Sequence, residues 1–91
     1  MEDRKMKKEK WCIVEEYEFY NGSSDMQAFT YVNKTMALLA LKPQYEELLK
    51  IFRNCGFEIE DSYLGDNTAW MTMKDGTRAK MRVCRLKPIN R

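Results

Sequence analysis

Apolar residues change their spacing twice along this chain, from alternation to a helical stripe and back to alternation. The central stripe recurs at steps of three and four residues and comprises Leu38, Leu41, Tyr45, Leu48, Phe52 and Cys55. This spacing predicts one amphipathic helix. The flanking segments alternate with a period of two, which is typical of strands with one buried face. The pattern predicts a single α+β domain with a ββαββ plan (hairpin, kinked helix, hairpin), the helix packed on one face of a mostly antiparallel sheet.

The predicted helix has two candidate starting points and one clear end. Asn33 and Thr35 are both suitable N-cap residues. Pro43 lies within the stripe, which keeps its phase across the proline, so we expect one kinked helix or two nearly collinear helices. Gly56 provides the C-terminal stop.

Strand-like segments lie on both sides of the helix. Residues 11–20 and 26–32 form the first predicted hairpin around a turn at 21–25, and their pattern leaves the pairing register open. After the helix, residues 57–64 alternate with Phe57, Ile59 and Tyr63 on one half-buried face. The two remaining strands, 68–73 and 77–86, form the last hairpin.

The register of the last hairpin follows from its side chains. A two-residue Asp-Gly turn would pair Met73 with Arg78 and mix apolar with cationic side chains on each face. A three-residue loop with Gly76 in a left-handed bulge conformation pairs Met73 with Thr77. In this register the apolar and the cationic side chains lie on opposite faces of the hairpin. We therefore predict the three-residue loop, with methionines and alanines on the inner face. The outer face then carries Trp70, Thr72, Arg78, Lys80 and Arg82.

The net charge is only +2, but the charged residues are distributed unevenly along the chain. Residues 11–73 carry four basic and ten acidic side chains, giving −6, whereas residues 74–91 carry seven basic side chains against Asp75 alone, giving +6. The alternation does not fix the strand order. The charge contrast favours placing residues 11–20 beside residues 77–86, so that Glu16 and Glu18 pair with the basic strand.

The length of the chain and its cysteine content limit the kind of protein it can be. The 91 residues predict one domain over 10–88, with a disordered charged segment at 1–9 and a tail at 89–91. The longest apolar run, 36–41, is far shorter than a membrane span of about 20 residues. Cys12, Cys55 and Cys84 are odd in number and lie among apolar neighbours. We expect them to act as small apolar side chains of a reduced, cytoplasmic protein.

The chain lacks the residues that several kinds of catalytic and metal-binding site require. The chain has no histidine, which excludes Ser-His-Asp and Cys-His constellations and removes the most common metal ligand. The segment Lys74-Asp75-Gly76-Thr77 has the composition of a hairpin turn and does not match a phosphate-binding loop. We therefore expect a protein without enzymatic activity, without a cofactor and without a bound metal.

The outer face of the last hairpin is the candidate binding surface. Trp70 is predicted opposite Lys80, with Arg78 and Arg82 diagonal to it. The first hypothesis is a protein-interaction domain that presents a sheet face or edge to another protein or to a second copy of itself. The alternative is weak binding of single-stranded or structured nucleic acid, because an aromatic ring among cations can stack on a base and neutralise phosphates. A purely structural role, with the acidic strand neutralising these cations, is the competing interpretation.

Overall fold

The computed structural model describes residues 10–86, which form one five-stranded sheet and one helix. In chain order the elements are β2 (Lys10–Glu18), β3 (Ser24–Tyr31), α1 (Lys34–Asn54), β4 (Ile59–Leu64), β5 (Thr68–Met73) and β6 (Arg78–Leu86). The predicted α+β class is confirmed. The ββαββ label leaves out one strand, because the three predicted segments 57–64, 68–73 and 77–86 all form strands after the helix. The predicted disordered segment 1–9 and tail 89–91 lie outside the described residues.

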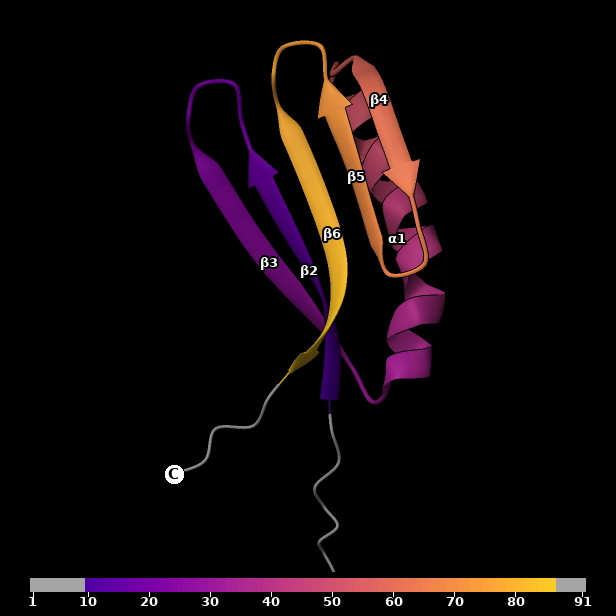
Figure 1. Cartoon of the computed structure of the whole chain (residues 1–91). Helices are drawn as coiled ribbons and strands as arrows, with labels where there is room; N and C mark the ends of the chain where they lie inside the picture. Colours follow the sequence, from indigo (N-terminus) through magenta and orange to yellow (C-terminus); the bar gives the residue numbers. More distant parts are fainter. Residues whose placement is uncertain (1–9, 87–91) are drawn as a thin grey trace, which may run out of the picture.

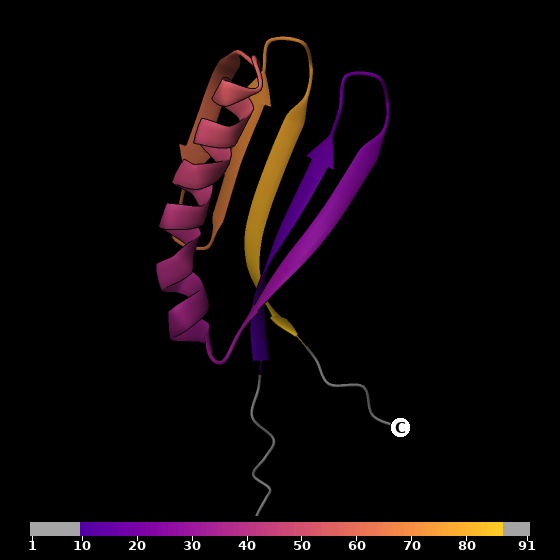
Figure 2. The same cartoon turned by 180° about the vertical axis from the view of Figure 1, so that it is seen from behind.

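The sheet is antiparallel throughout and has the strand order β3-β2-β6-β5-β4. The pairing of β2 with β6, which the charge contrast favours, is confirmed. In Figure 1 the helix lies behind β4 and β5, and in Figure 2, seen from behind, it lies in front of them. The helix therefore covers one face of the sheet. No helix or strand of residues 10–86 covers the opposite face, which we call the outer face.

The β5–β6 hairpin has the predicted three-residue loop. The Met73 N–H donates to the Thr77 carbonyl at 2.8 Å, and the Gly76 N–H donates to the Met73 carbonyl at 3.0 Å. Gly76 has φ 97°, in the left-handed region where glycine avoids the Cβ clash. The Asp75 carboxylate accepts the Thr77 N–H at 2.8 Å and closes the turn from its side chain.

The β2–β3 hairpin repeats this construction. The Phe19 N–H donates to the Ser23 carbonyl at 2.8 Å, and Gly22 follows with φ 90°. Asn21 takes the place of the aspartate, because its Oδ1 accepts the Ser23 N–H at 3.0 Å. The three-residue loop is therefore 20–22, which begins one residue before the predicted range 21–25, and the last two residues of that range belong to β3.

Helix α1 is continuous across Pro43, so the single-helix interpretation is confirmed. Asn33 rather than Thr35 is the N-cap, since its Oδ1 accepts the Met36 N–H at 2.9 Å. Pro43 lies on the exposed side of the helix, where solvent can hydrogen-bond the carbonyl that loses its partner. Gly56, with φ 92°, follows the helix end as predicted. Among residues 10–86, no helix has the length and apolar character needed to cross a membrane.

The hydrophobic core lies between α1 and the inner face of the sheet. Its buried members come from one helical stripe and from alternating strand positions, namely Ile13, Leu41, Tyr45, Leu48, Phe52, Ala69, Met71, Met73, Ala79 and Met81. The predicted inward orientation of the β5 and β6 methionines is therefore confirmed. Methionine suits this position, because its unbranched side chain fills the irregular gaps between a helix and a twisted sheet.

The prediction that all three cysteines act as small apolar side chains is wrong for Cys55. Cys12 is buried and Cys84 is half-buried, whereas Cys55 is exposed. Cys55 occupies the C-cap of α1, so the helical stripe ends before it reaches this position. A periodic pattern alone cannot indicate the residue at which a helix ends.

Candidate functional site

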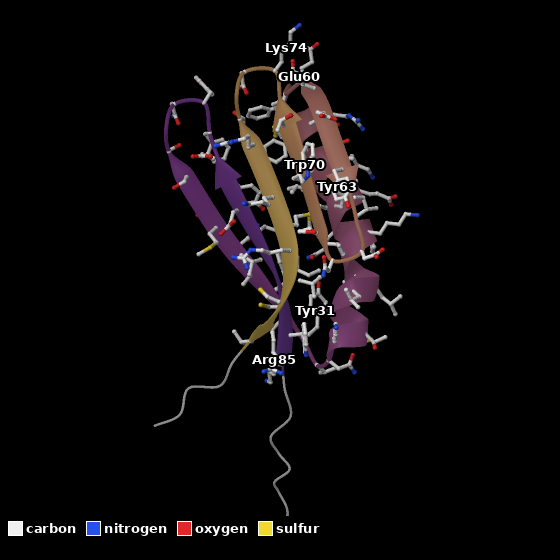
Figure 3. All side chains as sticks on the ribbon, in the orientation of Figure 1. Tyr31, Glu60, Tyr63, Trp70, Lys74 and Arg85 are labelled. Carbon is white, nitrogen blue, oxygen red and sulfur yellow. The ribbon has the colours of Figure 1, made fainter. Side chains whose placement is uncertain are left out.

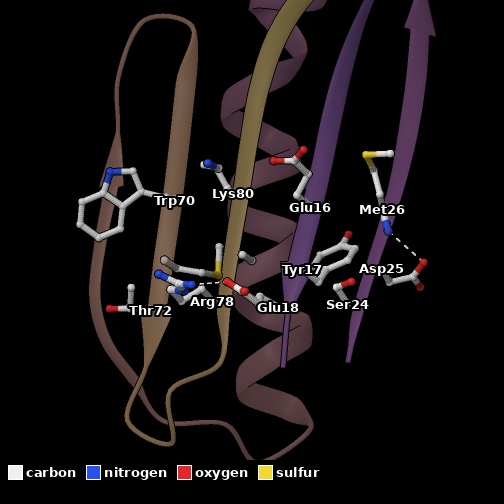
Figure 4. A pocket seen from close by; sticks show the side chains of 12 residues that line it. Glu16, Tyr17, Glu18, Ser24, Asp25, Met26, Trp70, Thr72, Arg78 and Lys80 are labelled. Atoms are coloured by element: carbon white, nitrogen blue, oxygen red, sulfur yellow. Dashed lines mark hydrogen bonds and ion pairs between the residues drawn. The ribbon is translucent and has the colours of Figure 1, made fainter. Parts of the chain in front are cut away.

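One row of side chains crosses the outer face of the sheet from edge to edge. Tyr63 is paired with Trp70, Trp70 with Lys80, Lys80 with Glu16, and Glu16 with Met26. Figure 3 shows Tyr63 and Trp70 together on β4 and β5, and Figure 4 shows the other members from Trp70 to Met26. The row therefore has two aromatic rings at one end, opposite charges in the middle and a thioether at the other end.

A shallow groove of about 740 Å³ lies along this row. Its volume falls in the range of about 300–1,000 Å³ that is typical of ligand sites. Strands β2, β3, β5 and β6 all contribute side chains to its lining, among them Glu16, Glu18, Met26, Trp70, Arg78 and Lys80 (Figure 4). The groove is the binding surface that the described part of the chain offers most directly.

The four residues predicted to form the binding surface all lie on this outer face. Trp70 is directly paired with Lys80, as the three-residue loop predicts. Arg78 is paired with Thr72, one position toward the loop on the same face, and Arg82 lies in the opposite direction along β6. Trp70, Arg78 and Lys80 line the groove, whereas Arg82 lies beyond its lining.

Acidic side chains of β2 engage two of the three cations. Arg78 forms an ion pair and hydrogen bond with Glu18 (Figure 4), and Arg82 Nη2 lies 3.6 Å from Glu16 Oε2. These side chains are exposed, so each pair contributes only about 0–1 kcal/mol to stability. Within residues 10–86, Lys80 forms no ion pair. Lys80 is therefore the cation of this face that is best placed to meet a carboxylate or phosphate from outside.

Tyr63 and Trp70 form a stacked pair at one end of the groove. Their ring centroids are 5.9 Å apart and the ring planes differ by 21°. Tyr63 is 50% exposed, so the pair presents aromatic surface to solvent. The prediction that Tyr63 shares the inner face with Ile59 is wrong. The β4–β5 register shifts between Ile59 and Asp61, and this bulge turns Tyr63 to the outer face.

Met26 and Tyr63 are the members of the row that the sequence pattern does not predict. Met26 lies on the edge strand β3 and is 62% exposed. A usable signal for Met26 exists in the Asn21-Gly22 turn. If that turn is given the same bulged loop as Asp75-Gly76, Glu16 pairs with Met26. The turn at Asp66-Asn67 gives a similar signal for Tyr63, because a hairpin closed at Gly65 and Thr68 pairs Tyr63 with Trp70.

A second polar cluster lies on the opposite, inner face of β2 and β3. Glu15 is only 4% exposed, and its Oε1 accepts hydrogen bonds from the Tyr17 hydroxyl and, at 3.3 Å, from Gln27 Nε2. Gln27 Nε2 also donates to the Tyr17 hydroxyl oxygen at 2.9 Å. Burial and then the hydrogen bond to Glu15 raise the pKa of Tyr17 to about 12. Tyr17 thus stays protonated at neutral pH, and the cluster ties β2 to β3.

No group of three or more potential metal-ligating side chains is assembled in residues 10–86. No protein family, curated protein or solved structure matches this chain. Its function must therefore be proposed from the groove and the residues around it.

Proposed function

We propose that this chain is a small protein-interaction domain that binds a partner protein in the groove on the outer face of its sheet. The observation that carries the proposal is the uncovered row in which Tyr63 and Trp70 stack beside Lys80. Protein interfaces typically combine an aromatic anchor at the centre with a polar, partly hydrated rim. Trp70 supplies the anchor, and the ion pairs of β2 with β6 supply the polar surroundings.

The charges on this face indicate what the partner presents. Arg78 and Arg82 have carboxylate neighbours within the chain, so covering them does not leave an isolated buried charge. Lys80 has no such neighbour within 4.0 Å among residues 10–86. We therefore expect the partner to place an apolar side chain against the Trp70 indole and a carboxylate at Lys80.

Comparison of variants tests this proposal even before the partner is identified. The immobilised chain is incubated with a lysate of its own source cells, in parallel with Trp70→Ala and Lys80→Glu variants. Lys50→Glu is the matched control, because Lys50 is an exposed lysine on α1, away from the outer face. We expect one protein to be retained by wild type and Lys50→Glu and lost by both groove variants.

Calorimetry then decides the case with the purified partner. Loss of an interface tryptophan anchor should weaken binding by about 2 kcal/mol or more, roughly thirtyfold. Circular dichroism of each variant establishes that its fold is retained. Equal binding of the partner to wild type, Trp70→Ala and Lys80→Glu would refute the groove as the binding surface. Sedimentation at two concentrations shows whether the partner is a second copy of this chain.

Binding of nucleic acid is the second candidate function, supported by the stack of exposed Tyr63 on half-buried Trp70 next to Lys80. It is less well supported, since Glu16 and Glu18 line the same groove and would repel phosphates. Anisotropy of a labelled single-stranded oligonucleotide, measured at two salt concentrations, tests it. Binding that weakens steeply with salt and disappears in the Trp70→Ala/Lys80→Glu double variant would favour this second candidate.

We further propose that the domain is not an enzyme and works in the cytoplasm. The groove carboxylates of Glu16 and Glu18 are engaged in ion pairs with Arg82 and Arg78, and within residues 10–86 the groove lining contains no histidine and no cysteine. The three free thiols suit a reducing compartment. A fluorescent fusion expressed in the source cells tests the location, and a signal outside the cytoplasm would contradict it.

A further inference from the structure

We propose that Cys12 and Cys84 form a reversible disulfide that joins strands β2 and β6 when the chain meets a low-molecular-weight disulfide such as oxidised glutathione. The two cysteines are directly paired in the β2–β6 register, and their Sγ atoms lie 3.8 Å apart. The Cys12 thiol also lies 3.6 Å from the Cys84 carbonyl oxygen, as a donor. This inference rests on observations separate from those that support protein binding.

The backbone already has the spacing that a disulfide needs. Directly paired residues of antiparallel strands have Cα atoms about 4.5 or 5.5 Å apart, depending on their place in the ladder. Both values fall within the range of about 4.4–6.8 Å that disulfides span. Both side chains lie on the outer face, so bond formation requires the sulfur atoms to approach from 3.8 Å to about 2.05 Å. Side-chain rotation can supply most of this movement.

The two thiols differ in accessibility and surroundings. Cys84 is half-buried, and Arg82 Nη1 lies 3.7 Å from its Sγ. Cys12 is only 3% exposed, and burial followed by the hydrogen bond to Cys84 raises the pKa of its thiol. Cys84 is therefore the thiol that meets the oxidant, and Cys12 is the thiol that resolves the intermediate.

The reaction consists of two thiol–disulfide exchanges. The Cys84 thiolate attacks one sulfur of oxidised glutathione, so that a mixed disulfide forms and one glutathione thiolate leaves. Cys12, once deprotonated, attacks the Cys84 sulfur and displaces the second glutathione thiolate. The two cysteine thiols are oxidised, and the two protons they lose reach the two glutathione thiolates. One molecule of oxidised glutathione is thereby reduced to two of glutathione.

Cys55 provides the internal control. It is exposed at the end of α1, apart from the β2–β6 pair, and it can form a mixed disulfide with glutathione. The full chain with Cys55→Ser is therefore treated with oxidised glutathione and examined by intact-mass spectrometry without reductant. We expect its mass to fall by two hydrogen atoms, both thiols to become unreactive, and a Cys12–Cys84 cross-linked peptide to appear. A reductant should restore both thiols, and the oxidised form should melt at a higher temperature than the reduced form.

A trapping variant tests the assigned order of attack. In Cys12→Ser, and independently in Cys12→Ala, the resolving thiol is missing, so glutathione should remain attached to Cys84. In Cys84→Ser, the buried Cys12 should react with glutathione more slowly than Cys84 does in the Cys12 variants. Peptide mapping of the Cys55→Ser chain remains a valid test even if a trapping variant fails to fold. The proposal is overturned if the Cys55→Ser chain retains stable glutathione adducts, or if the cross-linked peptide appears only after the chain has been unfolded.

Discussion

Trp70 and Tyr63 stack across β5 and β4 with their ring centroids 5.9 Å apart, and the place of the Tyr63 ring depends on a glycine. A Cβ atom added at Gly65 would lie 2.8 Å from Tyr63 Cε2, closer than real Cβ contacts allow. Gly65 is not in the left-handed region, so alanine is compatible with its backbone. The glycine thus leaves the space that the tyrosine ring occupies.

Gly65→Ala should displace the Tyr63 ring and separate it from Trp70. We expect the Trp70 fluorescence to shift and the free energy of unfolding to decrease by about 1 kcal/mol or less. Such aromatic pairs contribute about 0.5–1.5 kcal/mol. The measurement uses a Trp11→Phe background, so that Trp70 is the only indole. Asp66→Ala, in the same turn, is the control. Emission identical to that of the background chain would show that the stack does not depend on Gly65.

Met81→Ala should strongly destabilise the domain. Met81 is fully buried on β6, so truncation leaves a cavity between the sheet and α1. Such core substitutions typically cost about 2–5 kcal/mol. Met26→Ala is the matched control and should stay within about 0.5 kcal/mol, since Met26 is largely exposed. Urea unfolding of both variants measures the difference, and equal midpoints would contradict the assigned core.

Asn33→Ala should destabilise the domain by about 1 kcal/mol, because it removes the side-chain acceptor for the Met36 N–H. Thr35→Ala should change stability by less, and in the opposite direction if helix propensity dominates, since Thr35 lies within α1. Thermal unfolding followed by circular dichroism measures both. A larger loss for Thr35→Ala would place the cap at Thr35 instead.

The stability of the domain should decrease between about pH 10 and pH 12 through Tyr17. The pKa of Tyr17 rises from 10.0 to about 12 on folding, chiefly by burial and secondly by its hydrogen bond to Glu15. The folded chain therefore retains this proton more tightly than the unfolded chain. The stability that the protonated Tyr17 contributes to the fold is fully present below pH 10.0 and is lost as the pH approaches 12.

Tyr17→Phe should flatten that part of the pH profile. Urea unfolding at several pH values compares the two slopes, and the other alkaline groups contribute to both chains alike. Equal slopes in wild type and variant would mean that Tyr17 is not the group responsible. Tyr17→Phe should also be less stable near neutral pH, because Glu15 stays buried without one of its donors.

The sequence-based predictions succeed where one residue decides between two alternatives. Gly76 distinguishes a three-residue loop from a two-residue turn, since one residue of slip would exchange the faces of a whole strand. That choice correctly predicts that Trp70, Lys80 and both arginines share one face. The charge contrast likewise predicts the neighbours β2 and β6, because Glu16 and Glu18 need cationic partners.

The errors arise where tertiary contacts override a local pattern. Tyr63 follows the alternation of Ile59 in the sequence, but a bulge between them reverses its direction. A bulge depends on how two strands pair, so the sequence of one strand alone does not predict it. Cys55 continues the helical period, yet it lies at the C-cap of α1 and is exposed. The register of β2 with β3 remains open in the pattern, because apolar side chains occur on both faces of β3.

The central position of β6 in the sheet also governs when the domain can assemble during synthesis. The β2–β3 hairpin and α1 emerge from the ribosome before β6, yet β2 needs β6 as its second neighbour. Until β6 has been made, the β2–β3 and β4–β5 hairpins lack the strand that joins them into one sheet, so Ile13 and the apolar stripe of α1 are incompletely buried. Pairings between such distant segments slow folding, so nascent chains should expose this apolar surface to chaperones until the final strand arrives.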